Sequence, residues 1–228
     1  MTDPQPSRFS PPPLSITPMG EAAWLCLPPE GPLDIALQER VHALGDALAQ
    51  RPEVREVVPG MNNLLVLFDP FHAEADALAA AIAEEWCSAE PARRSAEVFE
   101  VPVVYGGGAG EDLKECAAHA GLSPEAFVRL HADGEYTVFT LGSHPGFAYL
   151  GGLDPRIAVP RRAVPRHKVA AGAVMIGGSQ TGVQACDNPT GWNLIGTTQA
   201  RFFDPAADPP AALRPGMRVR FVVREIVS

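Results

Sequence analysis

Three arginines lie close together in the C-terminal half of the chain and could bind an anion. The segment reads Val159-Pro-Arg-Arg-Ala-Val-Pro-Arg166, so Arg161, Arg162 and Arg166 follow prolines that restrain the backbone. Guanidinium groups bind carboxylates and phosphates through paired N–H donors. The arrangement predicts a binding site for such an anion, and a solvated charged turn is the alternative.

Amide, hydroxyl and indole groups accompany glycines in the motifs that follow. Gln180 and Thr181 lie within Gly177-Gly-Ser-Gln-Thr-Gly182, and Trp192 follows Gly191. Glycine allows tight turns that place neighbouring side chains in fixed directions. We expect the three guanidinium groups, the amide and the indole to converge on one concavity.

A histidine lies inside a further turn, Gly142-Ser-His-Pro-Gly-Phe147. Imidazole changes charge near neutral pH, so His144 is the candidate for proton transfer, with a solvent-facing turn residue as the alternative. The candidate substrate- or phosphate-binding residues of this half are Pro145, Phe147, Tyr149, Arg161, Arg162, Arg166, Gln180, Thr181, Gly191 and Trp192.

Several other kinds of site are not indicated. The glycine-rich segment 106–110 lacks the Gly-Lys-Ser/Thr ending of a nucleotide-binding loop. Glu111 and Asp112 follow it and would repel a phosphate at the start of the next helix, so a structural turn is favoured. The six histidines show no metal-ligand spacing, and no Gly-x-Ser-x-Gly motif marks a serine nucleophile.

Composition narrows the class of protein. The chain has 228 residues, 46% of them hydrophobic, which suffices for one large or two ordinary domains. A net charge of −9 argues against nucleic acid as the main partner. Four cysteines without a Cys-x-x-Cys pair, no apolar stretch of membrane-spanning length and no signal-peptide pattern predict a cytoplasmic protein with no membrane association.

The N-terminal half alternates between strand and helix patterns. Apolar residues recur every three or four positions in two segments, which predicts amphipathic helices. Short apolar runs predict strands, two of them joined as a hairpin across Pro59-Gly-Met-Asn-Asn63. The order β-α-β-β-α predicts a small α+β sandwich with its helices on one face of an antiparallel sheet. The predicted strands are 22–27, 54–58 and 64–68, and the predicted helices are 32–50 and 73–86.

Two segments mark the domain boundaries. Residues 1–13 are proline-rich and polar, which predicts a disordered leader. The charged, small-residue segment 88–95 is the candidate linker. We therefore expect an N-terminal domain over 14–95 and a second domain over 96–228 that carries the site.

The second half changes in character along its length. A strand over 98–105 opens it, followed by a helix over 112–120 and a shorter helix with Ser123 as N-cap. Short strands separated by glycine and proline follow, and an alternating strand after the turn Leu213-Arg-Pro-Gly216 ends the chain. This pattern favours a β-barrel or β-sandwich.

The motifs together resemble the family called PxpB (the B subunit of 5-oxoprolinase), KipI or allophanate hydrolase subunit 1. The resemblance covers nearly the whole chain from about residue 20. Several independent motifs occur in the same order as in the family, namely Gly142–Leu153, Pro160–Arg166, Gly178–Gly182 and Pro189–Thr198.

The resemblance implies an α+β domain followed by a cyclophilin-like β-barrel. It implies an ATP-hydrolysing 5-oxoprolinase, which opens 5-oxoproline to glutamate. The implied ATP, with or without Mg, would bind at this chain or at the interface of this chain with the C subunit. The implied partners are the C subunit, of the KipA or allophanate hydrolase subunit 2 type, and the A subunit, of the LamB/YcsF type. The chain would be inactive alone.

The resemblance also implies roles for the candidate residues. Arg161, Arg162 and Arg166 would hold a phosphate or the substrate carboxylate. Gln180 and Thr181 would bind the lactam or a phosphoryl oxygen, and the walls would be Phe147, Tyr149 and Trp192.

Four positions depart from the family motifs and leave the substrate open: Ser143, Ala148, Gln184 and Thr190. A KipI-like inhibitor that binds the dimerisation helices of a sensor histidine kinase is the alternative function. A carboxyltransferase-like module is a third.

Overall fold

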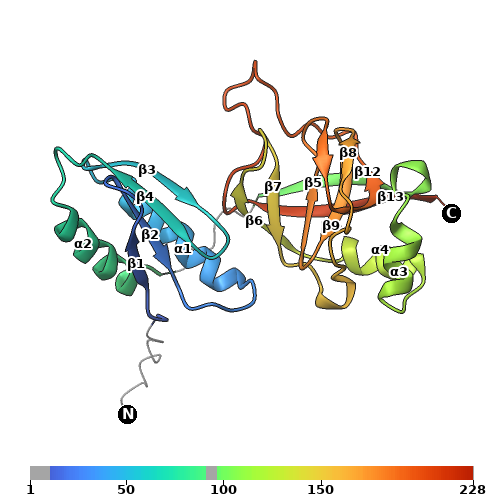
Figure 1. The fold of residues 1–228 in the computed structure, drawn as a ribbon. Coiled ribbons are helices and arrows are strands. Elements are labelled where there is room, and N and C mark those ends of the chain that lie inside the picture. Colours follow the sequence, from blue (N-terminus) through green and yellow to red (C-terminus); the bar gives the residue numbers. More distant parts are fainter. Residues whose placement is uncertain (1–10, 91–96, 228) are drawn as a thin grey trace, which may run out of the picture. The chain divides into compact units, whose positions relative to one another are not determined.

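The computed structural model describes residues 11–90 and 97–227 and divides into two compact units, Met1–Ala92 and Arg93–Ser228 (Figure 1). Most of the predicted leader and much of the predicted linker fall outside the described residues.

The first unit is a four-stranded antiparallel sheet with two helices. The strand order is β1-β2-β4-β3. The predicted order is confirmed, and one additional strand, β1, lies at the edge; its four residues end in Pro18, too short a pattern to be recognised. The elements are β1 (Ser15–Pro18), β2 (Ala23–Leu27), α1 (Ile35–Leu48), β3 (Val54–Pro59), β4 (Leu64–Phe68) and α2 (Ala75–Ser88).

The helix boundaries of this unit follow from local chemistry. The Asp34 carboxylate accepts a hydrogen bond of 2.7 Å from the backbone N–H of Leu37, so α1 begins at Ile35, three residues later than predicted. The apolar stripes of α1 and α2 pack on one face of the sheet around Leu44, Ile82 and Trp86.

The second unit is a closed barrel with the strand order β10-β7-β6-β13-β5-β12-β9 (Figure 1). This confirms the predicted barrel. The barrel strands are β5 (Val98–Gly106), β6 (Tyr136–Leu141), β7 (Ala148–Gly151), β9 (Ala173–Gly177), β10 (Gln180–Val183), β12 (Asn193–Thr197) and β13 (Arg218–Val227).

Shorter elements surround the barrel. The helix α4 begins after Ser123, whose hydroxyl accepts a hydrogen bond from the backbone N–H of Ala126, as predicted. The remaining elements are the 3-10 turns η1 (Gly107–Ala109) and η2 (Pro155–Ile157), the helices α3 (Leu113–His119) and α4 (Pro124–Ala132), and a two-stranded ribbon of β8 (Arg166–Val169) with β11 (Asn188–Thr190).

The glycine-rich segment before α3 has a structural role. Gly106 has a φ of 76°, and a Cβ there would lie 2.2 Å from the carbonyl oxygen of Val227 on β13. A Cβ on Gly110 would lie 2.6 Å from the backbone of Ile195 on β12. Glycine is needed because the chain crosses two strands at close range.

A buried histidine connects three elements inside the barrel. His131 of α4 lies 2.8 Å from the Tyr105 hydroxyl through Nδ1 and 2.8 Å from the Thr181 hydroxyl through Nε2. The Thr181 hydroxyl donates to the carbonyl of Met175, and the Tyr136 hydroxyl donates to the carbonyl of His131. Each ring nitrogen therefore has a partner, which allows a neutral imidazole in an apolar core.

Acid should weaken the fold through this histidine. Burial lowers the pKa of His131 to about 3, below its usual value. Because the unfolded chain binds a proton near pH 6.5 and the folded chain does not, stability is fully present above pH 6.5 and falls by about 1.4 kcal/mol per pH unit below it. Urea unfolding at pH 7, 6 and 5 should show this slope. A His131→Gln chain should be less stable at pH 7, but its free energy of unfolding should depend less on pH. An equal dependence on pH in both chains would show that His131 does not cause the loss of stability in acid.

Candidate functional site

An apolar and aromatic cluster lies on the outside of the barrel wall. Met175 and Leu194 belong to it, whereas the residues beside them on β9 and β12, such as Ile176 and Ile195, point into the barrel core. Alternation along a strand explains the two sides. The outer cluster contains Phe147, Val169, Ala173, Met175, Trp192 and Leu194, with Tyr149 packed against them.

Three aromatic rings of this cluster meet edge to face. The Phe147 ring centroid lies 4.9 Å from that of Tyr149 and 5.6 Å from that of Trp192, at interplanar angles of 87° and 83°. Such pairs are favourable because the positive edge of one ring meets the negative face of another. A Cβ on Gly177 would lie 2.6 Å from the Trp192 ring, so the indole lies directly on the backbone of β9.

Arg161 covers this aromatic cluster. Its guanidinium carbon lies 5.4 Å from the Trp192 ring centroid, a cation–π distance. Within the described residues no carboxylate forms an ion pair with Arg161, and the side chain is exposed. Its N–H groups are therefore open to an anionic ligand.

The predicted turn holds His144 against the same cluster. Ser143 and Gly146 have positive φ angles of 66° and 77°, and a Cβ on Gly146 would lie 2.7 Å from the Cβ of Phe203. This fixes the turn, leaves Pro145 exposed and places the His144 ring centroid 4.9 Å from that of Phe147.

The hydrogen bonds of His144 assign its proton. The amide nitrogen of Asn188 lies 3.0 Å from Nδ1 and can only donate, so Nδ1 accepts and the proton of the neutral ring is on Nε2. Burial lowers the pKa of His144. Nε2 is buried and has no hydrogen-bond partner among the described residues. The geometry thus fits a neutral N–H donor better than the general base expected from the sequence.

Replacing Asn188 with aspartate should raise the pKa of His144. The carboxylate would accept a hydrogen bond from Nδ1–H and favour the imidazolium, whereas the amide favours the neutral ring. NMR titration of the folded chain measures this directly, with an Asn188→Ser chain as a comparison that adds no charge. An unchanged His144 pKa in the aspartate chain would show that residue 188 does not contact the ring.

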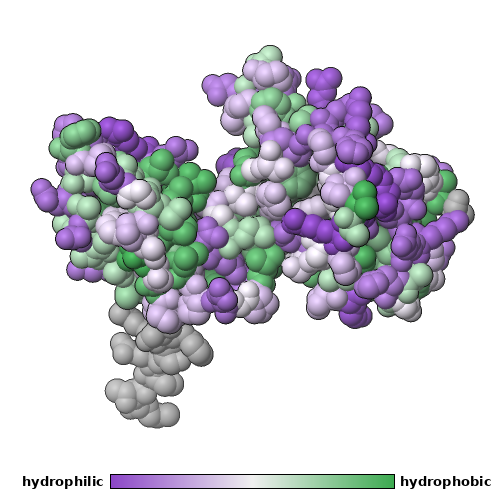
Figure 2. Space-filling model, in the orientation of Figure 1, coloured by the Kyte–Doolittle hydropathy of each residue, from purple (hydrophilic) through white to green (hydrophobic). Residues whose placement is uncertain are grey.

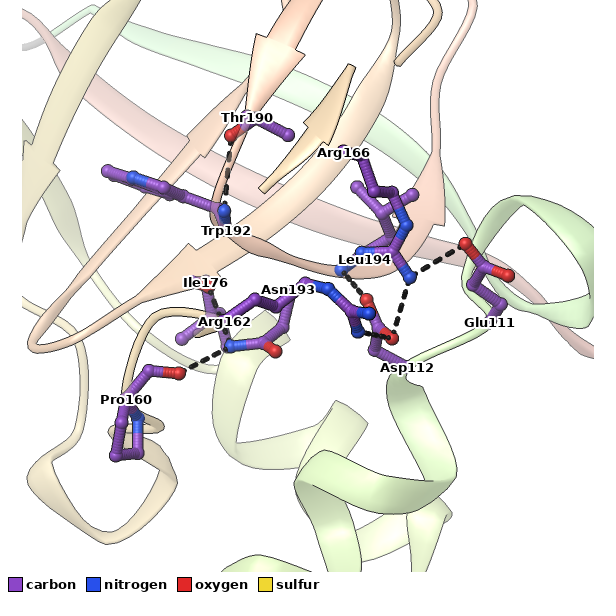
Figure 3. Close-up of polar contacts among 10 residues, drawn as sticks. All are labelled: Glu111, Asp112, Pro160, Arg162, Arg166, Ile176, Thr190, Trp192, Asn193 and Leu194. Atoms are coloured by element: carbon purple, nitrogen blue, oxygen red, sulfur yellow. Dashed lines mark hydrogen bonds and ion pairs between the residues drawn. The ribbon is translucent and has the colours of Figure 1, made fainter. Parts of the chain in front are cut away.

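The other two arginines converge on a buried carboxylate (Figure 3). Asp112 Oδ1 accepts hydrogen bonds of 2.9 Å from both Arg162 Nη1 and Arg166 Nη2, and Oδ2 accepts one of 2.7 Å from the backbone N–H of Leu194. Glu111 lies 2.7 Å from Arg166 Nη2. Hydrogen bonding to Asp112 raises the pKa of Arg166.

The expectation that the arginine trio forms one anion site is therefore corrected. Two guanidinium groups face two carboxylates, and the local charge is balanced at the start of α3. These ion pairs join α3 to β12 and to the ribbon, while Arg162 Nε and Arg166 Nη1 are buried without a hydrogen-bond partner among the described residues. Arg161 alone of the three faces the aromatic cluster.

The expectation that Thr181 faces a substrate is also corrected. Its side chain points into the barrel, where both of its hydrogen bonds are made to the core. Gln180 is the preceding residue of β10 and is buried, with its side chain on the opposite side of the strand.

Three site residues were not recognised from the sequence: Asp112, Asn188 and Asn193. The Asn193 amide donates to the carbonyls of Pro160 and Ile176, which attaches the arginine segment to β9 (Figure 3). Gly191 has a related role because its carbonyl accepts a hydrogen bond of 2.7 Å from the Arg162 N–H. Asparagine in turns is common, so spacing alone gives no signal for these roles.

A hollow of about 440 Å³ lies beside the arginine segment. Residues Val159 to Val164 and Asn193 line one side, and Glu115, Cys116 and His119 of α3 line the other. Among the described residues no group of three His, Cys, Asp or Glu could hold a metal ion. In the same residues, no helix combines the length and apolarity that a membrane span requires.

Comparison with known proteins identifies the family. The model for the carboxyltransferase domain, subdomain C and D, matches residues 14–213. A protein of Escherichia coli O157:H7, named as the B subunit of 5-oxoprolinase, is 46% identical over 205 residues, which cover 90% of this chain and 93% of that protein. This chain belongs to the family of 5-oxoprolinase B subunits. A Haemophilus influenzae protein of the same name is 38% identical and matches 93% of this chain and 99% of its own length.

Solved structures of related proteins share the fold. TTHA0988 is 36% identical, with a TM-score of 0.76, over 89% of this chain but only 40% of its own. The urea carboxylase of Kluyveromyces lactis matches 93% of this chain and 22% of its own at a TM-score of 0.71, and at 18% identity it shows the fold alone.

Two of the four departures from the motifs of the 5-oxoprolinase B subunits, Thr190 and Gln184, make hydrogen bonds in the structure. The Thr190 hydroxyl accepts a hydrogen bond of 3.2 Å from the Trp192 N–H (Figure 3). The Gln184 amide donates to the carbonyl of Asn188 at 3.1 Å. Both contacts support residues beside the aromatic cluster, so these substitutions preserve the site's framework.

Proposed function

We propose that this chain is the B subunit of an ATP-dependent 5-oxoprolinase, which converts 5-oxoproline, ATP and water to glutamate, ADP and phosphate. The observation that carries the proposal is the 46% identity to a protein of that name, which extends over nearly all of both chains. A ring amide is a poor electrophile, and phosphorylation of its oxygen creates a group that water can displace. The chain works with the C and A subunits and is inactive alone.

The outer aromatic cluster is the proposed site for 5-oxoproline. Tyr149 is the partly exposed ring of the cluster, and the buried rings of Phe147 and Trp192 pack beneath it as the floor of the proposed site for the five-membered ring. Arg161 supplies N–H groups for the carboxylate of 5-oxoproline. The cation–π contact with the Trp192 indole holds the guanidinium group beside the aromatic cluster. The buried Nε2–H of His144 supplies a donor for the lactam oxygen.

Among the described residues, neither the glycine-rich segment nor the pair Arg162 and Arg166 fits a phosphate cradle for ATP. The glycine-rich segment approaches β12 and β13 closely, and Arg162 and Arg166 are already bound to carboxylates. We therefore assign the nucleotide to the partner subunits, and this chain to the binding and orientation of the lactam.

The test is phosphate release by the three reconstituted subunits, with and without 5-oxoproline and with this chain omitted. The proposal predicts stimulation by 5-oxoproline only in the complete assembly. Equal phosphate release without this chain would contradict it. No specific observation favours the kinase-inhibitor alternative.

A further inference from the structure

The central strands of the first unit are apolar on both faces. β4 reads Leu-Leu-Val-Leu-Phe and β2 reads Ala-Trp-Leu-Cys-Leu. An antiparallel sheet with one face in water normally alternates apolar and polar residues. In β4, Leu64, Val66 and Phe68 already fill the helix-covered core. The remaining leucines face the other way.

The strand register places these remaining residues side by side. Leu25 pairs with Leu65, which also pairs with Val58, and Leu67 pairs with Ala23. Paired residues of an antiparallel sheet point to the same face. The apolar centre of this outer sheet face consists of Ala23, Leu25, Leu27, Val58, Leu65 and Leu67, and by the same pairing Ser15, Thr17 and Glu56 lie at its two edges.

The outer sheet face lies opposite both helices of its unit. The core shared with α1 and α2 contains none of its residues. Leu27 and Val58 are 38% and 39% exposed, large values for apolar strand residues. Figure 2 shows hydrophobic residues gathered where Figure 1 draws the strands of this unit. Contiguous apolar surface of this kind marks interaction sites.

We infer that the outer sheet face docks the second subunit of the assembly, the one that corresponds to the part of TTHA0988 beyond its match to this chain. This inference rests on the proposed function. In TTHA0988 the matched stretch is only 40% of one polypeptide, so further protein is covalently joined to the equivalent of this chain. The relatives are named as subunits, which requires a surface for another chain.

The charge of the chain favours a different partner over a second copy. Two copies with a net charge of −9 each repel one another. Glu56 of β3 is exposed, pairs with Leu67 of β4 and adds negative charge at the margin of the face. The matching surface is therefore apolar at its centre, with lysine or arginine at its edge.

The test measures binding of the full chain to that partner, taken as the protein of the same genome most similar to the unmatched part of TTHA0988. Leu67→Glu and Leu25→Glu should each weaken binding at least about 30-fold, because a charge would be buried in an apolar contact. Phe71→Glu is the matched control, since Phe71 is 89% exposed and lies outside the strands. Circular dichroism and thermal unfolding confirm that each variant is folded.

The outcomes separate this inference from the proposed function. Unchanged binding by both folded leucine variants would overturn the docking surface, even if the complete assembly hydrolyses ATP. If the leucine variants bind the partner more weakly but the wild-type assembly shows no 5-oxoproline-dependent turnover, the docking surface is supported and the proposed reaction is rejected. A wild-type homodimer in light scattering that Leu67→Glu converts to a monomer would assign the face to a second copy and overturn the inference.

Discussion

Replacing Arg161 with alanine should raise the KM of the assembled enzyme for 5-oxoproline by about 10- to 100-fold, the value of a hydrogen bond to a charged group. Arg161 has no carboxylate partner among the described residues, so its loss removes a ligand contact and leaves no buried charge behind. The free energy of unfolding should change little. Steady-state phosphate release at varied 5-oxoproline concentration measures the effect.

Arg156→Ala is the matched control for this change. Arg156 is also an exposed arginine of the second unit, but it binds Asp154 and lies outside the aromatic cluster. Its replacement should leave the KM unchanged. Equal KM values for the Arg161→Ala and wild-type assemblies would remove Arg161 from the substrate site.

Replacing Asp112 with alanine should destabilise the second unit by about 3–5 kcal/mol, the usual cost of breaking a buried ion pair. Its side chain is only 6% exposed and accepts hydrogen bonds from Arg162, Arg166 and the backbone of Leu194. Without the carboxylate, Arg162 loses its ion-pair partner, and the half-buried Arg166 keeps only the more exposed Glu111. Urea unfolding at pH 7 measures the loss.

An exposed ion pair of the same unit provides the comparison. Glu100 pairs with Arg220, and both side chains are more than half exposed. Glu100→Ala should change stability by less than about 1 kcal/mol. If Asp112→Ala cost no more than Glu100→Ala, the ion cluster would not be the element that joins α3 to β12.

Local patterns predicted most of the elements. Helical periodicity located α1 and α2 within a few residues, and the Pro59–Asn63 turn located the β3–β4 hairpin. The parallel pairing of β13 with β5 could not be predicted, because these strands are more than a hundred residues apart and neither carries a signal for its neighbour.

For the candidate site, the sequence indicated residue types but not the directions in which their side chains point. The aromatic residues and Arg161 do lie together, as expected. Thr181 points into the barrel because β10 alternates, and the sequence does not show which face of a short strand is inside. Arg162 and Arg166 bind Asp112, some fifty residues away, and only the fold shows that pairing.

The central claim is that the lactam reacts while bound over the outer aromatic cluster. The most direct measurement compares glutamate formation by assemblies that carry Gly177→Ala or Gly108→Ala. A Cβ at residue 177 would lie 2.6 Å from the Trp192 ring and must displace the indole, whereas one at residue 108 has nothing within 4 Å. The account predicts a rate at least about tenfold lower for Gly177→Ala, because small displacements of positioning groups are costly, and an unchanged rate for Gly108→Ala. Equal rates in the two folded, assembled variants would contradict it.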